Sequence, residues 1–199
     1  MNKGILFIIS APSGTGKSTL IKSLIKKISK YKTKISISYT TRNKRMGELN
    51  GKHYYFISRN KFKKMIKNKE FLEYAIIFEN YYGTPKKIIK NLLLKGINIF
   101  LNINWQGAKQ VKKKIKNNIS IYIIPPSIKE LIKRLKKRGS ENQIDIKKRI
   151  KQSMKEIKHY IKYDYLIIND KFNVALSDLR NIFISEYKKI KNKENIIQT

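Results

Sequence analysis

The segment ILFIISAPSGTGKST, residues 5–19, joins a continuous apolar run to a glycine-rich turn and then to a helical pattern. A short apolar run bounded by turn residues is typical of a strand that is buried on both faces of a parallel sheet. After the turn, apolar residues recur at helical spacing from Leu20 to Ile28, with lysines between them. The segment therefore predicts a buried strand, a tight loop and a helix in direct succession.

The loop in this segment has the chemistry of a phosphate site. Successive backbone N–H groups in such a loop add to the dipole of the following helix and form a concave anion site. Glycines permit the required backbone angles, Lys17 supplies positive charge, and the Ser18 hydroxyl can bind Mg²⁺. The usual pattern opens with glycine, whereas this chain has Ala11. We predict a nucleoside triphosphate site formed by Ala11, Pro12, Ser13, Gly14, Thr15, Gly16, Lys17, Ser18 and Thr19.

Further apolar runs alternate with helical patterns along the chain. Strands are expected at residues 97–103, 119–124 and 165–168, and a last helix at about 174–189. This alternation predicts an α/β fold with a mainly parallel sheet flanked by helices. Two segments interrupt it. Short polar-aromatic runs around one helical pattern predict a small antiparallel-type insertion from Ile35 to about Tyr82, and a helical pattern runs from Ser127 to about Lys158. We expect both to be mobile subdomains on a fixed core.

Composition restricts the possible classes of protein. The 199 residues suit one domain, and 46 Lys and Arg against 13 Asp and Glu give a formal charge of +33. The basic residues are 39 Lys and 7 Arg, beside 36 Ile and 18 Asn. Lys, Ile and Asn all have codons with A or T in the first two positions, so base composition explains most of the charge. Without Cys, disulfide scaffolds, thiol catalysis and Cys-ligated zinc are excluded.

The apolar runs also bear on location. The first run, Ile5 to Ile9, is too short for a signal peptide or a membrane span, and no later run reaches eighteen apolar residues. We therefore expect a cytoplasmic protein that binds no membrane. The positive charge predicts non-specific nucleic-acid binding at low salt, but we expect no specific nucleic-acid partner because no aromatic-basic recognition motif is present.

Several further motifs resemble the guanylate kinase family. They are residues 38–42 (SYTTR), 45–48 (RMGE), 51–54 (GKHY), 80–84 (NYYGT) and 105–107 (WQG), and the resemblance is collinear from about Gly4 to Leu179. Alanine at position 11 is ordinary in that family. The resemblance implies Mg²⁺-dependent transfer of the γ-phosphoryl group of ATP to GMP or dGMP, giving ADP and GDP, in purine nucleotide metabolism.

The same resemblance implies a P-loop kinase core with two attached subdomains. The core would comprise residues 1–34, 83–125 and 159–199, the GMP-binding subdomain residues 35–82, and the lid residues 126–158. Family roles pass to this chain by position. The phosphate of GMP would be held by Arg42, Arg45, Tyr54 and Tyr82, and guanine would be read by Ser38, Glu73, Gly83, Thr84 and Asn104. The ATP phosphates would be approached by Arg134, Arg138 and Arg149, and adenine by Asn169.

The distribution of arginine supports these assignments. An arginine fork binds phosphate oxygens bidentately, whereas lysine offers a point charge. Five of the seven arginines fall on the phosphate positions named above, in a chain that otherwise prefers lysine. We therefore predict that catalysis depends on Lys17, Arg42, Arg138 and Arg149. No general base is obvious, which suits an acceptor phosphate that is already ionised near neutral pH.

Glu73 carries the prediction of acceptor specificity. Guanine presents two adjacent donors, N1–H and the exocyclic amine, which one carboxylate can accept together. Adenine has an acceptor at N1 and no amine at C2, so it would leave the carboxylate unpaired. A buried unsatisfied group costs about 1–3 kcal/mol, and more when it is charged.

Two positions depart from the family pattern. The family usually has aspartates where this chain has Asn102 and Asn104. By resemblance, position 102 would organise water around Mg²⁺ and position 104 would assist guanine recognition. An amide keeps one acceptor oxygen but loses the charge and adds a donor. We expect an active enzyme with weaker handling of GMP or Mg²⁺.

Three alternatives stay open at the level of sequence. The first is a guanylate-kinase-like binding module with impaired catalysis, which the two asparagines favour and the intact phosphate loop opposes. The second is a related P-loop kinase with another acceptor, such as a phosphorylated sugar, which would not need Glu73. The third is a nucleic-acid-binding protein, suggested by the charge alone. The sequence does not determine the oligomeric state.

Overall fold

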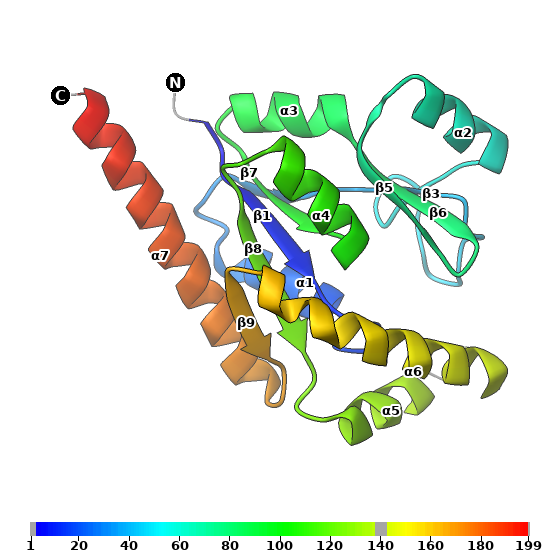
Figure 1. Ribbon diagram of the computed structural model, residues 1–199. Helices are drawn as coiled ribbons and strands as arrows, with labels where there is room; N and C mark the ends of the chain where they lie inside the picture. Colours follow the sequence, from blue (N-terminus) through cyan, green and yellow to red (C-terminus); the bar gives the residue numbers. More distant parts are fainter. Residues whose placement is uncertain (1–2, 138–142, 199) are drawn as a thin grey trace.

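A five-stranded parallel sheet forms the centre of the molecule in the computed structural model, which describes residues 3–137 and 143–198 (Figure 1). Its strand order is β2-β7-β1-β8-β9. The strands are β1 (Leu6–Ser10), β2 (Thr33–Ile35), β7 (Asn98–Asn102), β8 (Ile119–Ile124) and β9 (Tyr165–Ile168). All four pairings in this sheet are parallel, so the carboxyl ends of the strands lie at one edge.

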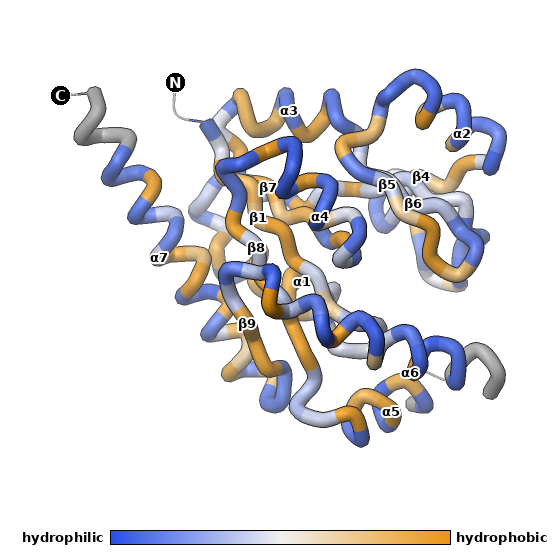
Figure 2. Tube along the Cα trace, in the orientation of Figure 1, coloured by the Kyte–Doolittle hydropathy of each residue, from blue (hydrophilic) through white to orange (hydrophobic). Residues whose placement is uncertain are grey.

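The apolar run of β1 faces two hydrophobic cores at once. Phe7 and Ile9 pack with α1 (Lys17–Lys27) and α7 (Phe172–Gln198), whereas Leu6 and Ile8 pack on the other side with α3 (Lys86–Leu94) and α4 (Trp105–Lys114). Because successive side chains of a strand point to opposite faces, a strand covered on both sides needs apolar residues throughout. Figure 2 shows the same pattern, with apolar strands at the centre and hydrophilic residues along the outer sides of the helices.

The expected insertion contains a second sheet, with strand order β4-β3-β6-β5. Its strands are β3 (Tyr39–Thr40), β4 (Tyr55–Phe56), β5 (Phe71–Ile77) and β6 (Asn80–Pro85), with helix α2 (Arg59–Lys67) packed beside them. Phe62 of α2 stacks on Phe71 of β5 with ring centroids 4.4 Å apart. A side chain at Gly83 would meet both rings within 3 Å, so this strand has to carry glycine there.

This second sheet is mixed rather than wholly antiparallel. The pairs β3–β6 and β5–β6 are antiparallel, but β3 and β4 pair in parallel because residues 41–54 cross between them. The sheet also extends to Pro85 through β6, past residue 82, where the sequence pattern ended the insertion.

The expected lid segment contains α5 (Ile128–Lys137) and α6 (Gln143–Ile157), followed by the 3₁₀ helix η1 (Lys158–Lys162). The Ser127 hydroxyl accepts a hydrogen bond from the Glu130 N–H at 3.1 Å, which caps the start of α5. In Figure 1, α5 and α6 lie on the opposite side of the carboxyl edge of the central sheet from the second sheet. Both peripheral segments therefore reach the edge where the phosphate loop lies.

The structure corrects two sequence expectations about the core. Strand β2 was not predicted, because its three residues are largely polar and it pairs at the edge of the sheet. The last helix begins two residues earlier than expected and continues to Gln198 instead of ending near residue 189. Leu176, Leu179 and Phe183 anchor its first half in the core, and no glycine or proline follows to end it.

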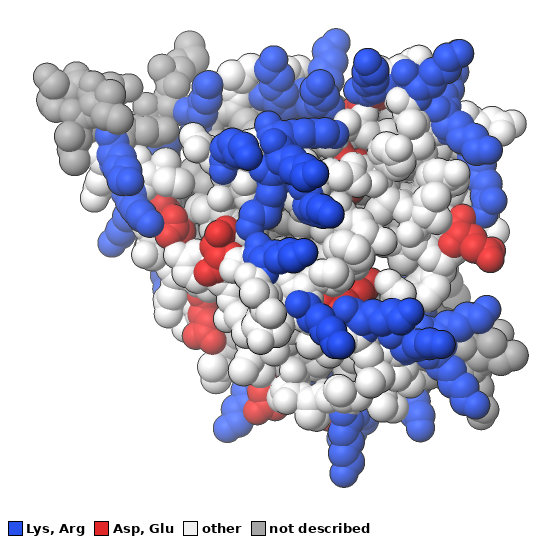
Figure 3. Space-filling view, viewed as in Figure 1, with Lys and Arg blue, Asp and Glu red and all other residues white. Residues whose placement is uncertain are grey.

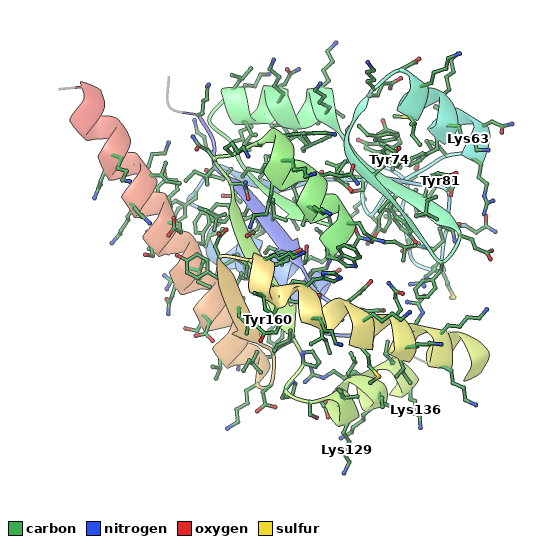
Figure 4. The ribbon with its side chains drawn as sticks, in the orientation of Figure 1. Lys63, Tyr74, Tyr81, Lys129, Lys136 and Tyr160 are labelled. Atoms are coloured by element: carbon green, nitrogen blue, oxygen red, sulfur yellow. The ribbon has the colours of Figure 1, made fainter. Side chains whose placement is uncertain are left out.

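Most of the positive charge lies on solvated surfaces. In Figure 3, Lys and Arg side chains are spread over much of the visible face, with few acidic side chains between them. Lys63 of α2 and Lys129 and Lys136 of α5 are exposed and extend away from the protein interior (Figure 4). Within the described residues, no helix combines the length and the apolar character needed to cross a membrane.

Candidate active site

The carboxyl edge of the central sheet opens into a cleft of about 560 Å³. One wall is the phosphate loop between β1 and α1, together with the residues that follow β7. The other walls come from the second sheet and from α6. Ligands of parallel α/β sheets bind at this edge, so the topology itself marks the cleft as the candidate site.

The phosphate loop is fixed from behind by buried hydrogen bonds. Gly14 and Gly16 have φ angles of +89° and +83°, in the left-handed region that favours glycine. The Thr15 hydroxyl donates to the Pro12 carbonyl at 3.0 Å, and the Asn169 side-chain amide donates to the Thr15 carbonyl at 2.6 Å. A Cβ at Gly16 would lie 2.8 Å from that amide. The loop therefore keeps its shape before any ligand binds.

Lys17 begins helix α1 and points toward the end of β7. Its ammonium group donates to the Ile103 carbonyl at 3.0 Å. Burial lowers the pKa of Lys17 to about 8, against the opposing effect of the negative charges of Glu156 and Glu73. The lysine is thus held by a carbonyl in a cleft that Glu73 and Glu156 also line.

Ser18 and Asn102 lie next to each other in the cleft. The Asn102 side-chain amide donates to the Ser18 hydroxyl oxygen at 3.2 Å. Both residues could meet Mg²⁺, Ser18 through its hydroxyl and Asn102 through its amide oxygen and a water molecule. Within the part of the chain that the structure describes, no three His, Cys, Asp or Glu side chains form a metal-binding group. The donors available here suit a magnesium ion that is bound mainly by nucleotide phosphates.

Glu73 of β5 is a buried acid that lines the cleft. The residue is only 3% exposed, and the Thr84 hydroxyl donates a hydrogen bond to its Oε1 at 2.5 Å. The hydroxyls of Thr84 and Ser38 lie 3.4 Å apart, so the three polar groups form one row. Burial raises the pKa of Glu73 to about 7, although the hydrogen bonds from Thr84 act to lower it.

Gly107 of α4 makes this arrangement of Glu73 possible. A Cβ at position 107 would lie 2.3 Å from Glu73 Oε2, closer than real Cβ contacts come. Asn104 precedes the helix, and its Oδ1 accepts a hydrogen bond from the Gly107 N–H at 3.0 Å, which caps the helix. Helix α4 therefore brings its first turn against the carboxylate.

Arg42 and Arg45 form a basic group at the side of the cleft formed by the second sheet. The Arg42 guanidinium donates to both carboxylate oxygens of Glu48, at 2.8 and 2.9 Å, and the Arg45 N–H donates to Glu48 at 2.8 Å. Although burial acts to raise it, the pKa of Glu48 lies below its usual value because these donors bind the carboxylate. Arg42 also lies 5.7 Å from the ring centre of Tyr54, which in turn meets Tyr82 edge-on.

Helix α6 brings Arg149 to the phosphate loop. The Arg149 guanidinium donates to the Ser13 hydroxyl at 3.1 Å, and the Ser153 hydroxyl donates to the Ser13 carbonyl at 3.4 Å. The same guanidinium lies 5.1 Å from the ring centre of Phe78, at the tip of the β5–β6 hairpin. Arg149 therefore links α6, the phosphate loop and the second sheet across the cleft.

Other predicted site residues lie outside the cleft lining. Arg134 donates to the carbonyls of Asn169 and Asp170, at 2.8 and 3.4 Å, and to Glu130 at 2.9 Å. Asn169 supports the back of the loop through Thr15. Gly83 and Thr84 lie behind the cleft surface, Thr84 acting through Glu73. Arg138 falls outside the described residues.

The cleft also contains residues that the sequence did not single out. Glu156 and Gln152 line it from α6, and Phe78 lines it from the second sheet. The spacing of Arg149, Gln152 and Glu156 places all three on one face of a helix, which is a signal that the sequence did contain. This spacing alone could not identify Gln152 and Glu156 as site residues, because nothing in the sequence says which face of that helix meets the loop.

Comparisons with known proteins agree on one family. The sequence model of the guanylate kinase family matches residues 3–186. A guanylate kinase of Buchnera aphidicola subsp. Schizaphis graminum is 53% identical, over 99% of this chain and 97% of that protein. One from Yersinia pestis bv. Antiqua is 50% identical, over 94% and 90% respectively. The crystal structure of guanylate kinase from Anaplasma phagocytophilum matches with a TM-score of 0.76 and 33% identity, over 94% of this chain and 87% of that one.

The raised pKa of Glu73 predicts a pH-dependent gain in stability for Glu73→Gln. The Glu73 carboxyl binds its proton more tightly in the folded protein than in the unfolded chain. Its burial therefore does not lower the free energy of unfolding below about pH 4.5, where it is protonated in both states, and lowers it fully above about pH 7, where it is ionised in both. We expect Glu73→Gln to raise the free energy of unfolding by about 2 kcal/mol at pH 8 and by little at pH 4.5. Urea unfolding at both pH values measures this difference. The exposed Glu70→Gln variant is the control, and an equal gain at both pH values would contradict the assignment.

Proposed function

Because the chain belongs to the guanylate kinase family, we propose that it transfers the γ-phosphoryl group of ATP to GMP or dGMP, with Mg²⁺, and releases ADP and GDP. The observation that carries this proposal is the position of Glu73. A buried carboxylate and the phosphate loop line the same cleft. One cleft thus offers a phosphate-binding loop and a carboxylate suited to a base that donates two hydrogen bonds.

Guanine recognition would depend on the ionised form of Glu73. The N1–H and the exocyclic amine of guanine would donate to the two carboxylate oxygens, and two donors favour the charged form over the proton that burial favours. The Thr84 hydroxyl already donates to Oε1, which fixes the direction of the carboxylate. AMP would leave the acid unpaired, at a cost of about 1–3 kcal/mol or more.

The phosphate of GMP would be bound by Arg42, Arg45, Tyr54 and Tyr82. Glu48 holds the Arg42 guanidinium in place through two hydrogen bonds, so little side-chain entropy remains to be lost on binding. The Tyr54 hydroxyl stays protonated near neutral pH, because burial raises its pKa above the ordinary value of a tyrosine, and it can donate to a phosphate oxygen. We propose that these four residues place the acceptor oxygen in line with the γ-phosphorus.

The phosphates of ATP would lie on the loop from Ala11 to Thr19. Backbone N–H groups of the loop and the Lys17 ammonium would bind them, and Arg149 from α6 would add charge at the γ-phosphate. Ser18 would hold Mg²⁺, with Asn102 assisting through water, and the ion would neutralise charge on the β- and γ-oxygens. Arg134 and Asn169 would help to position ATP near its adenine, and Arg138 would approach the ATP phosphates from the lid.

Residues 35–82 and 126–158 are proposed to close over the core when both nucleotides bind. The contact between Arg149 and Phe78 supports this proposal, because it joins the two peripheral segments across the cleft. Closure would exclude water, which would otherwise compete with GMP for the phosphoryl group. The protein residues would then contribute orientation and positive charge, and the acceptor phosphate needs no general base.

A nucleotide panel tests the function directly. With ATP and Mg²⁺, a coupled assay for ADP should show turnover with GMP and dGMP, and a value of kcat/KM at least tenfold lower with AMP and UMP. Turnover with a phosphorylated sugar in place of GMP would identify another P-loop kinase. An absence of turnover with every acceptor would favour the binding module.

The scarcity of arginine predicts that Arg42→Lys impairs binding of GMP. Lysine keeps the charge but loses the bidentate contact, which is worth about 1–2 kcal/mol, or roughly tenfold in KM for GMP. The KM for ATP should stay within about twofold of its original value. Arg180→Lys, at an exposed position of α7, is the matched control. An unchanged KM for GMP in Arg42→Lys would argue against this phosphate site.

The contact between Asn102 and Ser18 predicts that Asn102→Asp lowers the requirement for Mg²⁺. An aspartate removes the amide donor from the Ser18 hydroxyl and adds a charge that attracts the cation, worth about 1 kcal/mol. The Mg²⁺ concentration for half-maximal rate should fall roughly fivefold, and Asn104→Asp should act on the KM for GMP instead. Asn91→Asp on the exposed side of α3 is the control. An unchanged Mg²⁺ dependence would show that asparagine at position 102 does not weaken the binding of Mg²⁺.

A further inference from the structure

Glu156, near the end of α6, is a buried carboxylate that the proposed function does not use. The residue is 7% exposed and lines the same cleft as Lys17. Removing a carboxylate from water is expensive unless a partner compensates for its charge. Its position among the phosphate-binding residues is unexpected, because a negative charge there repels the substrates unless it acts on a protein cation.

Two hydrogen bonds define where Glu156 lies. The Gln152 side-chain amide, one helical turn earlier, donates to Glu156 Oε1 at 3.0 Å and orients the carboxylate. The Tyr122 hydroxyl of β8 donates to the Glu156 backbone carbonyl at 2.6 Å, which ties this part of α6 to the central sheet. The backbone of Glu156 is therefore tied to the sheet, and its carboxylate is oriented by a side chain of its own helix.

The rest of the same helix face is docked on the phosphate loop. Arg149 and Ser153 both bond to Ser13, through its hydroxyl and its carbonyl. Residues 149, 153 and 156 are spaced by four and three positions, so they lie along one side of α6. Docking of this side on the loop necessarily carries the Glu156 carboxylate to the interior of the cleft.

Lys17 is the loop cation with which Glu156 shares the cleft. Burial raises the pKa of Glu156 and the positive charge of Lys17 acts to lower it, whereas the charges of Glu156 and Glu73 act to raise the pKa of Lys17. Glu73 is already engaged by Thr84 and, in the proposed function, by guanine. Gln152 is a neutral partner and does not compensate for the charge of Glu156.

We propose that Glu156 is a positioning residue, whose negative charge, carried to the loop by the docking of α6, orients the Lys17 ammonium for the phosphates of ATP. The inference rests on the proposed function and adds a residue to it. It also assigns a second task to α6. Besides supplying Arg149, the helix sets the position of the lysine that begins α1.

The test is Glu156→Gln, which keeps the shape of the side chain and removes its charge. We expect kcat to fall roughly tenfold, as for residues that act through a neighbouring contact, while the KM for GMP changes less than about twofold. Glu156→Asp restores the charge one methylene short and should recover part of the rate. Glu186→Gln is the matched control, because Glu186 lies on α7 outside the cleft lining and is 9% exposed, and its carboxylate accepts a hydrogen bond from the Tyr165 hydroxyl of β9. That variant should keep kcat.

A double-variant comparison tests whether Glu156 affects the rate through Lys17 or by another route. In single-turnover experiments at high enzyme concentration, adding Glu156→Gln to Lys17→Gln should lower the rate no further, because the group on which Glu156 acts is already gone. An additional tenfold loss in that background, or an unchanged kcat in Glu156→Gln alone, would overturn the inference. If Glu156→Gln does not fold, as judged by circular dichroism, Gln152→Ala replaces it. This variant removes the hydrogen bond that orients the Glu156 carboxylate, so it should also lower kcat when Lys17 is present and have no further effect in Lys17→Gln. A wild-type protein without GMP kinase activity would instead refute the proposed function.

Discussion

The enclosed position of Lys17 is the constraint on which the rest of the site depends. The lysine can occupy it because β1 is buried on both faces and so fixes where the loop and α1 begin. Its ammonium donates to the carbonyl of Ile103, which follows β7, the strand paired in parallel with β1. A buried ammonium needs negative partners. Glu73 from β5 and Glu156 from α6 line the same cleft, and their negative charges act to raise the pKa of Lys17 against the effect of burial.

The same site shows where stability is given up for recognition. Glu73 would be less costly as an uncharged residue, since burial raises its pKa to about 7. Helix α4 carries glycine where it meets the carboxylate, although alanine is the better helix former by about 1 kcal/mol. The buried carboxylate of Glu73 and the glycine at position 107 each lower the stability of the fold, and the glycine leaves the space that the carboxylate occupies. Such agreement between unfavourable choices is typical of a binding site.

Much of this arrangement could be predicted from the sequence, and the remainder has physical reasons for being hidden. The apolar run of β1 and the glycines of the loop depend on local sterics, so they predict their own structure. The guanine and phosphate residues were found through a resemblance, and their roles stay predictions. Strand β2, the parallel β3–β4 pair and the support given by Arg134 and Asn169 depend on what packs beside them. Helical spacing places Glu156 on the face of Arg149, but only the docked helix shows that this face meets the loop.

The acidic residues of the cleft are a feature that the composition does not suggest. A chain with a formal charge of +33 has its lysines mostly on solvated faces, whereas three of its 13 acids, Glu48, Glu73 and Glu156, line the cleft proposed for two anionic nucleotides. Each acid has a definite reason to be there. Glu48 holds Arg42, Glu73 is proposed to accept hydrogen bonds from guanine, and Glu156 is proposed to orient Lys17. Phosphate binding needs cations fixed in direction more than it needs a large charge, and an unpaired lysine on a flexible stem is not fixed. Glu48 and, in our proposal, Glu156 therefore contribute what the many surface lysines cannot, because they fix the direction of Arg42 and Lys17.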